Sequence, residues 1–403
     1  MTAGDNHPLK DKLPFPLLAA ISALPPLSVD MYLPAMPAMA EDMNTQISVI
    51  QNSLSVFLVA FGVGMLLFGP LSDRFGRRPL AIFGLAGFGI TCLLLALSPS
   101  VNSFLVLRFF QGLLGSAATI TVPAMIRDCL GKDTAKGIST VTMIMLSAPL
   151  VAPLIGSVLL TFSSWRSVFY ALSLYATVVF LMTLKKLPET LLANNAAPVS
   201  FVRNYLAILA TEKIYAFLAT FLMSSIAFFT YLTSAPFVYI TWFGVSEIGF
   251  GIIFTSTAAA LILANFINTR IVSRMGSLSV MRMGIAFAVC FSLLLFLVLT
   301  TEQSMYLVIA FFFVIIGSLG LISVNAEALI LIKFPNQASS ASAVTRTLRY
   351  STGALVGPIL AILYTGTPVP IGALVLGSVI GAALIQIGLY IKTKKPGKDH
   401  LHN

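Results

Sequence analysis

Long stretches without charge constrain this chain more than any other feature. Nine intervals are mostly apolar and contain no Asp, Glu, Lys or Arg: residues 43–72, 79–107, 137–165, 167–184, 214–246, 248–269, 283–301, 303–326 and 350–391. A helix needs about 20 apolar residues to cross the hydrocarbon core of a bilayer. Charged residues make up 9% of the 403 residues, whereas soluble domains contain about 25%. The chain is therefore expected to lie in a lipid bilayer.

The number of spans follows from these intervals. The interval 350–391 has room for two helices, which break at the turn-forming segment 365–370. Two further apolar segments, 17–40 and 103–126, carry one charge each. The sequence thus predicts an all-α membrane protein with twelve transmembrane helices.

Basic residues predict how the chain is oriented, because cytoplasmic loops are enriched in Lys and Arg. With both termini in the cytoplasm, the inner loops and tails hold 20 of the 24 basic residues, and the outer loops hold only Arg166. Trp165 and Trp242 then fall at the outer ends of spans, where tryptophan often anchors a protein at the interface. The net charge of +10 is mostly explained by this topology.

Several classes of protein are excluded. No polar domain carries a basic face for nucleic acid, and no G-x-x-x-x-G-K-[ST] motif is present to bind ATP. The three histidines lie in the tails and the three cysteines have no paired spacing, so neither a metal site nor a disulfide framework is indicated. We expect no enzyme activity, no cofactor and no metal.

A polar stretch, 185–213, divides the spans into six and six. Spans five and eleven share Leu-Val-small-Pro at an offset of 205 residues, and spans one and seven share Tyr-Leu-x-x-x-Pro at an offset of 199. We therefore predict an N-terminal half (1–190), a cytoplasmic linker (191–212) and a C-terminal half (213–403). Duplicated halves of this kind hold a substrate between them and rock to give alternating access.

Charged residues inside spans are candidates for function, because burying a charge in a bilayer is costly. Asp30 and Arg108 lie at similar predicted depth in spans one and four, so they either pair or line one polar cavity. Burial raises the pKa of a carboxyl group and a nearby cation lowers it, and a carboxyl balanced between the two effects can carry protons. We predict that Asp30 and Arg108 couple proton movement to transport; the alternative is a static salt bridge.

A second group of charges lies in the C-terminal half. Glu327 is near the inner end of span ten, and Arg346 and Arg349 are early in span eleven. These residues can form an inner gate, pair structurally, or leave positive charge for an anionic substrate. The sequence does not decide between these three roles.

The loop between spans two and three combines Gly69, Asp73, Arg74, Gly76, Arg77 and Arg78. Its glycines allow close helix approach and a tight turn, and Asp73 beside the three arginines can form a charge network that latches the inner side. Ordinary positive-inside charge accounts for the arginines alone. In span five, Pro149, Pro153 and Gly156 predict a bending helix, or a kink that serves packing.

These motifs resemble those of the major facilitator superfamily. The loop from Gly69 to Arg78 is similar to the signature G-x-L-x-D-R-x-G-R-[RK], and Arg108-x-x-Gln111-Gly112 resembles the span-four motif of proton-linked members. The segment 148–157 partly resembles the antiporter motif of span five. The segments 27–37 and 187–190 are similar to the bicyclomycin and chloramphenicol resistance branch of the drug:proton antiporters.

The resemblance implies a major facilitator fold and proton-driven efflux of small amphipathic compounds across the bacterial inner membrane, by a monomer. Candidate substrate-binding residues are Tyr32, Gln51, Ser55, Gln111, Tyr231 and Asn325. The charges at 327, 346 and 349 leave open export of a particular anionic metabolite, such as a carboxylate siderophore. The sequence is also compatible with a proton-coupled uptake symporter and with a non-transporting receptor.

Overall fold

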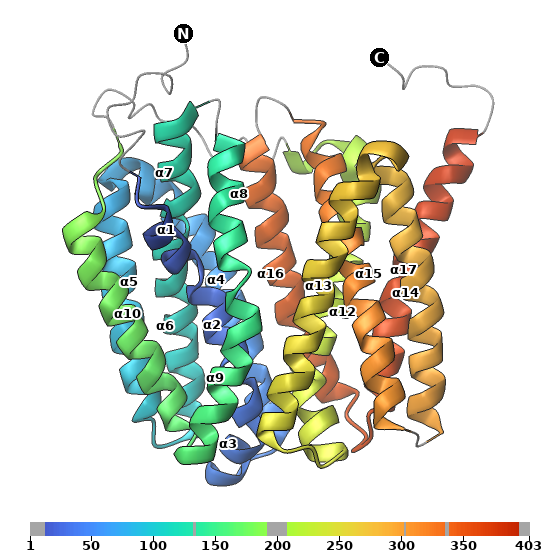
Figure 1. Cartoon of the computed structure of the whole chain (residues 1–403), viewed down its shortest axis with the longest axis horizontal. Helices are drawn as coiled ribbons and strands as arrows, with labels where there is room; N and C mark the ends of the chain where they lie inside the picture. Colours follow the sequence, from blue (N-terminus) through green and yellow to red (C-terminus); the bar gives the residue numbers. More distant parts are fainter. Residues whose placement is uncertain (1–12, 132–133, 192–207, 302–303, 335–337, 395–403) are drawn as a thin grey trace. The chain divides into compact units, whose positions relative to one another are not determined.

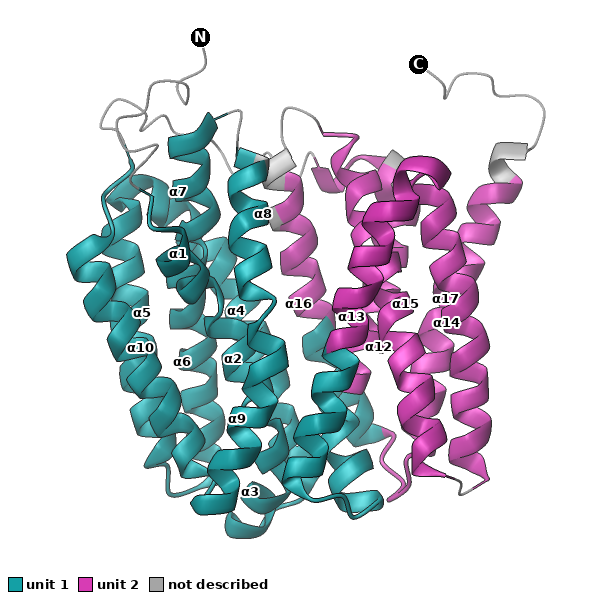
Figure 2. Ribbon diagram, viewed as in Figure 1, with its two compact units in different colours: residues 1–201, 233–258, 353–362 teal, residues 202–232, 259–352, 363–403 magenta. Residues whose placement is uncertain are grey.

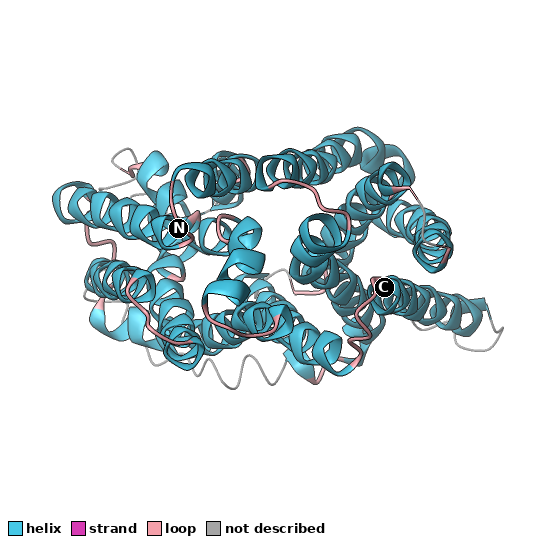
Figure 3. Cartoon of the chain, turned by 90° about the horizontal axis from the view of Figure 1, so that it is seen from below, coloured by secondary structure: helices cyan, strands magenta, loops and turns pink. Residues whose placement is uncertain are grey.

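The computed structural model describes residues 13–131, 134–191, 208–301, 304–334 and 338–394, and every regular element among them is a helix (Figures 1 and 3). The first six spans are formed by α1 Phe15–Ser22, α2 Leu24–Asp30, the 3-10 turn η2 Leu33–Ala35, α3 Met36–Asp42, α4 Ile47–Phe75, α5 Arg77–Ala96, α6 Val101–Thr119, α7 Thr121–Leu130, α8 Thr134–Met145, α9 Ala148–Phe162 and α10 Arg166–Lys186. The second six are formed by η5 Glu212–Ile214, α12 Tyr215–Pro236, the π-helical turn η6 Phe237–Trp242, α13 Glu247–Met275, α14 Ser277–Thr300, α15 Met305–Leu331, α16 Ala338–Ile362 and α17 Val369–Lys394.

The predicted all-α membrane fold is confirmed. Among the described residues, eleven helical stretches are long and apolar enough to cross a membrane. The remaining long helix, α16, has 25 residues, and Arg346 and Arg349 make its first half less apolar. The charge-free interval begins at residue 350, but the helix begins at Ala338 and contains Arg346 and Arg349, which the sequence also placed in this span. A charge-free interval marks the end of a span only where the helix itself carries no charge.

The helices form two compact units that do not follow chain order (Figure 2). Unit 1 holds residues 1–201, 233–258 and 353–362, and unit 2 holds residues 202–232, 259–352 and 363–403. The end of α12 with η6, the start of α13 and the end of α16 therefore pack with the first six spans. The predicted division into halves at 191–212 follows the sequence repeat, whereas these units follow packing, so the halves stay a prediction.

In unit 1, α4 and α5 both pack along α6, and α10 packs along α5. A side chain at Gly112 of α6 would meet the Phe57 carbonyl oxygen of α4, and one at Gly84 of α5 would lie 2.5 Å from the Ala118 nitrogen. Small residues let helices approach closely in lipid, where van der Waals contact replaces the hydrophobic effect as the attraction between helices. These approaches hold α6, and with it Arg108, against α4 and α5.

In unit 2, α14 packs along α15 and α17. A cluster of buried apolar side chains joins α12, α15 and α16, and consists of Ile208, Ile214, Leu218, Ile330, Ala341 and Val344. This cluster fixes the first half of α16, which carries both of its arginines.

Proline divides the first span into four short elements. Each element has proline as its second residue: Pro16, Pro25, Pro34 and Pro37. Proline has no N–H to donate to the preceding turn, but its fixed φ suits the first turn of a helix. The sequence itself therefore dictates where this span is interrupted.

The sequence suggested that Trp165 anchors the protein at the membrane interface, but its side chain is buried within the protein. Its side chain is 2% exposed, packs edge-on against Phe104 and Phe169, and donates from Nε1 to Asp42 Oδ2 at 3.0 Å. An indole at a helix end can be buried when neighbouring helices supply aromatic rings and an acceptor.

Candidate functional site

Asp30 is the last residue of α2, at the interruption of the first span. Pro34 lies four residues later and has no N–H for the Asp30 carbonyl, which accounts for the end of the helix here. Asp30 is 6% exposed. The break therefore places a buried carboxyl group inside a span.

Arg108 lies within α6 and is completely buried. Its guanidinium carbon is 4.2 Å from the ring centroid of Tyr32 and 4.8 Å from that of Phe57. Its Nη1 donates to Gln111 Oε1 at 2.5 Å and to the Ser28 carbonyl at 3.3 Å. Nε and Nη2 have no hydrogen-bond partner among the described residues. A buried guanidinium with two such nitrogens is costly, so this arginine is not simply a packing element.

The predicted candidates Tyr32 and Gln111 meet around Arg108, but Asp30 does not form an ion pair with it in the described part of the chain. Arg108 instead uses two aromatic faces and the amide of Gln111, which also donates to Cys92 Sγ at 3.1 Å. The static salt bridge that the sequence allowed is therefore not formed among the described residues.

Other predicted binding residues of the first half connect helices. The Tyr32 hydroxyl lies 3.2 Å from Ser53 Oγ. Gln51 Nε2 donates to the Thr233 carbonyl at 3.0 Å, and Ser55 Oγ accepts from the Gly357 N–H at 3.2 Å. These last two bonds join α4 to the segments of α12 and α16 that belong to unit 1.

Both connections use helix backbone close to a proline. Pro236 lies three residues after Thr233, and the π-helical turn η6 begins directly after it. Pro358 is the residue after Gly357. Proline and π-helical turns alter the backbone hydrogen bonds of a helix, and π-helical turns often occur at functional sites. The hydrogen bonds of Gln51 and Ser55 therefore depend on the position of these second-half helices.

The two remaining candidates lie in unit 2. The Tyr231 ring is 4.8 Å from that of Phe312. Asn325 is 1% exposed and donates from Nδ2 to Asn268 Oδ1 at 2.8 Å and to the Leu321 carbonyl at 2.9 Å. The role of these two residues in substrate binding stays a prediction.

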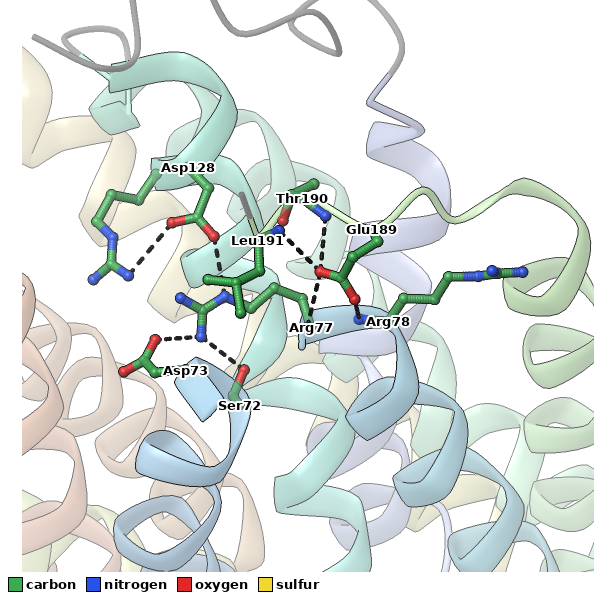
Figure 4. Close-up of polar contacts among 9 residues, drawn as sticks. Ser72, Asp73, Arg77, Arg78, Asp128, Glu189, Thr190 and Leu191 are labelled. Carbon is green, nitrogen blue, oxygen red and sulfur yellow. Dashed lines mark hydrogen bonds and ion pairs between the residues drawn. The ribbon is translucent and has the colours of Figure 1, made fainter. Parts of the chain in front are cut away.

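Arg77 is the centre of the polar network at the turn between α4 and α5 (Figure 4). It is 2% exposed and forms ion pairs with Asp73 and, at 3.0 Å, with Asp128 Oδ2. Its Nη1 also donates to Ser72 Oγ at 2.9 Å. These contacts join spans two, three and four within unit 1. A latch onto the C-terminal half stays a prediction.

Glu189, after α10, supplies the second part of this network (Figure 4). Its two carboxylate oxygens accept from the backbone N–H groups of Arg77 at 3.1 Å and Arg78 at 3.0 Å. These are the first two N–H groups of α5, which have no partner within the helix. A carboxylate at this position also interacts favourably with the helix dipole.

Asp128 and Glu189 are the residues that sequence reasoning did not assign to the network. The sequence did contain a signal that α5 needs an acceptor from elsewhere. The helix starts after Gly76, which has no side chain to cap its first N–H groups, and Glu189 supplies that acceptor. No comparable signal marked Asp128, which lies 51 residues from Arg77.

Gly76, Gly69 and Arg74 differ in what surrounds them. Gly76 has φ +103°, and a side chain there would lie 2.6 Å from Glu189 Oε2. Among the described residues, no neighbouring helix comes within 4 Å of the corresponding position at Gly69, so the close helix approach predicted there is not seen. Arg74 is exposed and stacks on Phe75 with its guanidinium carbon 5.4 Å from the ring centroid.

The second charge cluster consists of Glu327, Arg346 and Arg349. Glu327 Oε1 accepts from the Ser342 hydroxyl at 3.2 Å and lies 3.8 Å from Arg346 Nε. The Arg346 side chain is 53% exposed, so this pair is weak. Arg349 contacts aromatic rings instead of a carboxylate among the described residues. Among the described residues, Glu327 thus forms an ion pair with Arg346 and none with Arg349.

Span five is interrupted where the sequence predicts a bend. Between α8 and α9 the chain makes a turn at residues 146–147, just before Pro149, and Pro153 lies inside α9. A side chain at Gly156 would overlap the Met31 carbonyl oxygen. Gly156 therefore lets α9 lie against the interruption that follows Asp30.

The comparisons with known proteins decide the family. The model of the Major Facilitator Superfamily matches residues 18–358. The chain belongs to the major facilitator superfamily. Its resemblance to the bicyclomycin and chloramphenicol resistance branch is confirmed by relatives. A bicyclomycin resistance protein homolog of Haemophilus influenzae is 33% identical, over 90% of this chain and 93% of that protein. A chloramphenicol resistance protein of Pseudomonas aeruginosa is 32% identical, over 69% of this chain and 67% of that protein.

Solved structures show the same fold. The human organic anion transporter MFSD10 has a TM-score of 0.70 at 16% identity, covering 94% of this chain and 99% of that one. A D-xylose-proton symporter has a TM-score of 0.70 at 16% identity, covering 91% and 96%. The major facilitator fold of twelve helices is thus confirmed, and the chain is a multi-pass membrane protein of a transporter family.

Proposed function

We propose that this protein is a proton-coupled antiporter that exports small amphipathic compounds from the bacterial cytoplasm. Relatives named for resistance to bicyclomycin and chloramphenicol support efflux of such compounds. The predicted topology supports an arrangement with both termini, and the turn at Gly76, on the cytoplasmic side. We expect a monomer with two six-helix halves.

The observation that carries proton coupling is the buried carboxyl of Asp30 beside a helix interruption, without an ion pair to Arg108 in the described structure. A carboxylate locked to an arginine would stay ionised, whereas a buried carboxyl without that partner can bind and release a proton as its surroundings change. Arg108 contacts α2 through the Ser28 carbonyl, two residues before Asp30. Movement of α2 relative to α6 would therefore alter the distance between the two charges.

Alternating access then needs helices whose contacts can open. Gln51 and Ser55 bind backbone groups of interrupted second-half helices, and Thr255 Oγ1 donates to the Leu150 carbonyl at 3.0 Å, joining α13 to α9. Each of these connections is a single hydrogen bond of modest net strength. We propose that they close the side opposite the Gly76 turn and break when that side opens.

The test is accumulation of radiolabelled chloramphenicol and of a panel of amphipathic drugs by inside-out vesicles with an acid lumen. We expect the wild-type protein to accumulate compounds, and Asp30→Asn to lose at least about 90% of the proton-driven rate, because the amide carries no titrating proton. Asp42→Asn is the matched control. Asp42 ends the same span, where its side chain is 45% exposed and paired with Arg166, and the variant should keep most of the rate.

Proton-driven accumulation that survives Asp30→Asn would overturn the coupling assignment. Loss of substrate from the same vesicles, with uptake in right-side-out vesicles, would show a symporter instead. Absence of transport in both orientations would support a receptor without transport.

A further inference from the structure

Arg349 lies against two aromatic rings in unit 2. Its guanidinium carbon is 5.3 Å from the ring centroid of Phe228 and 5.7 Å from that of Phe221. The two phenylalanines are seven residues apart on α12, which corresponds to about two helical turns, so they lie on the same side of that helix. A guanidinium that contacts ring faces retains N–H groups at its edge for other partners.

Among the described residues no carboxylate forms an ion pair with Arg349, although Glu327 is near enough to attract it electrostatically. Glu327 is the acidic residue of the cluster, and its contacts go to Ser342 and Arg346. The described structure gives Arg349 no ion pair and no hydrogen bond, although its side chain is half-buried. Together the three residues Glu327, Arg346 and Arg349 carry one uncompensated positive charge.

An uncompensated arginine inside a helical bundle is costly, and such residues usually face a partner or a substrate path. Arginine binds a carboxylate through two parallel N–H···O bonds, and phenylalanine faces provide an apolar surface for a planar group. The arrangement therefore suits a molecule that combines a carboxylate with an aromatic ring.

We propose that Arg349, Phe221 and Phe228 form a binding site for the carboxylate end of aromatic amphipathic anions. The inference deepens the proposed function and rests on it, because it names the class of compound that this exporter takes. Arg349 supplies the charge that selects anions over neutral compounds, and the phenylalanines contact the ring.

The test measures binding to the full-length protein in nanodiscs of zwitterionic phosphatidylcholine. The probes are 4-biphenylcarboxylate and 4-biphenylcarboxamide, which share a ring system and differ in charge. We expect the wild-type protein to bind the carboxylate at least about tenfold more tightly than the amide. Arg349→Gln should remove this preference and leave the Kd of the amide within about twofold. Arg349→Lys should restore part of it, because lysine keeps the charge but not the planar fork.

Arg270→Gln is the matched control. Arg270 also lies in unit 2 and stacks on a phenylalanine, with its guanidinium carbon 5.0 Å from the Phe266 ring, but both residues are exposed. This variant removes the same charge and should keep the wild-type preference for the carboxylate.

A wild-type protein without preference for the carboxylate, or an Arg349→Gln variant that retains it, overturns the inference. Loss of the preference when anionic lipid is added would assign the site to a lipid headgroup and overturn it as well. The proposed efflux is judged separately, by proton-driven accumulation of uncharged drugs in vesicles. If that accumulation fails while Arg349-dependent binding is present, only the export function is lost.

Discussion

The turn between α4 and α5 and the turn between α13 and α14 have the same backbone but different side chains. Gly76 has φ +103° and ψ 157°, and Gly276 has φ +76° and ψ 151°. Each glycine directly follows a helix of 29 residues. The two positions are 200 residues apart, close to the offsets of 199 and 205 found for the sequence repeats. The second turn therefore supports duplication of the halves.

The side chains around the two glycines differ in charge. Asp73 and Arg77 flank the first turn, whereas Ser273 and Ser277 occupy the equivalent positions in the second. A side chain at Gly76 would meet Glu189, whereas in the described part of the chain nothing beyond the adjacent residues lies within 4 Å of the corresponding position at Gly276. The fold therefore requires a residue with positive φ at both turns. The ionic network is present only at the first turn among the described residues.

The same contrast separates the arginines. Arg77 has two carboxylate partners, and its positive charge is neutralised within unit 1. Arg108 and Arg349 contact aromatic rings and form no ion pair with a carboxylate of the described residues. A neutralised arginine holds structure together, whereas an arginine that is not neutralised is available to a proton-carrying group or a ligand.

Replacing Arg77 should give the largest change in stability. Arg77→Gln removes the buried cation that Asp73 and Asp128 share and leaves Asp128 only its pair with Arg127 at 3.5 Å, while the two carboxylate side chains are only 28% and 17% exposed. We expect the free energy of unfolding to fall by about 3 kcal/mol, measured by titration with sodium dodecyl sulfate in mixed micelles. If the free energy of unfolding falls by less than about 1 kcal/mol, the network around Arg77 does not stabilise the first turn beyond what the uncharged turn at Gly276 achieves.

Replacing the two turn glycines should separate backbone strain from contact with Glu189. Gly76→Ala and Gly276→Ala both force a left-handed φ on alanine, which costs about 1–2 kcal/mol. In Gly76→Ala the new methyl group also displaces the carboxylate that caps α5, so we expect a further loss of about 1 kcal/mol. The same titration measures both variants. Equal losses would show that the Glu189 cap adds nothing to the first turn.

The smallest effect is expected from the exposed arginines of the two turns. Arg74 and Arg274 are both exposed and occupy equivalent positions. Arg74→Gln and Arg274→Gln should each change the free energy of unfolding by less than about 0.5 kcal/mol, because neither forms a buried ion pair. A larger loss for Arg74→Gln alone would extend the network of the first turn to this residue.

Local features of the structure could be predicted from the sequence. Charge-free intervals located most spans, prolines located the interruption of span five, and Asp73 and Arg77 were expected to interact. Partners distant in sequence could not be predicted. Glu189 lies 112 residues from Arg77, and the rings around Arg108 come from two other spans. Pattern reasoning also misjudged Trp165, because hydropathy does not reveal which neighbours will surround a helix end.

The sequence by itself determined that this chain crosses a membrane many times, where its helices break and which family it resembles. These properties depend on the transfer of each segment from water to lipid and on the missing N–H of proline, and both are local. Only the tertiary structure decided which charges are neutralised. The rotation and close approach of helices in lipid depend on small residues and shape complementarity between distant segments. For that reason Arg77 meets Asp128, and Arg349 meets two phenylalanines.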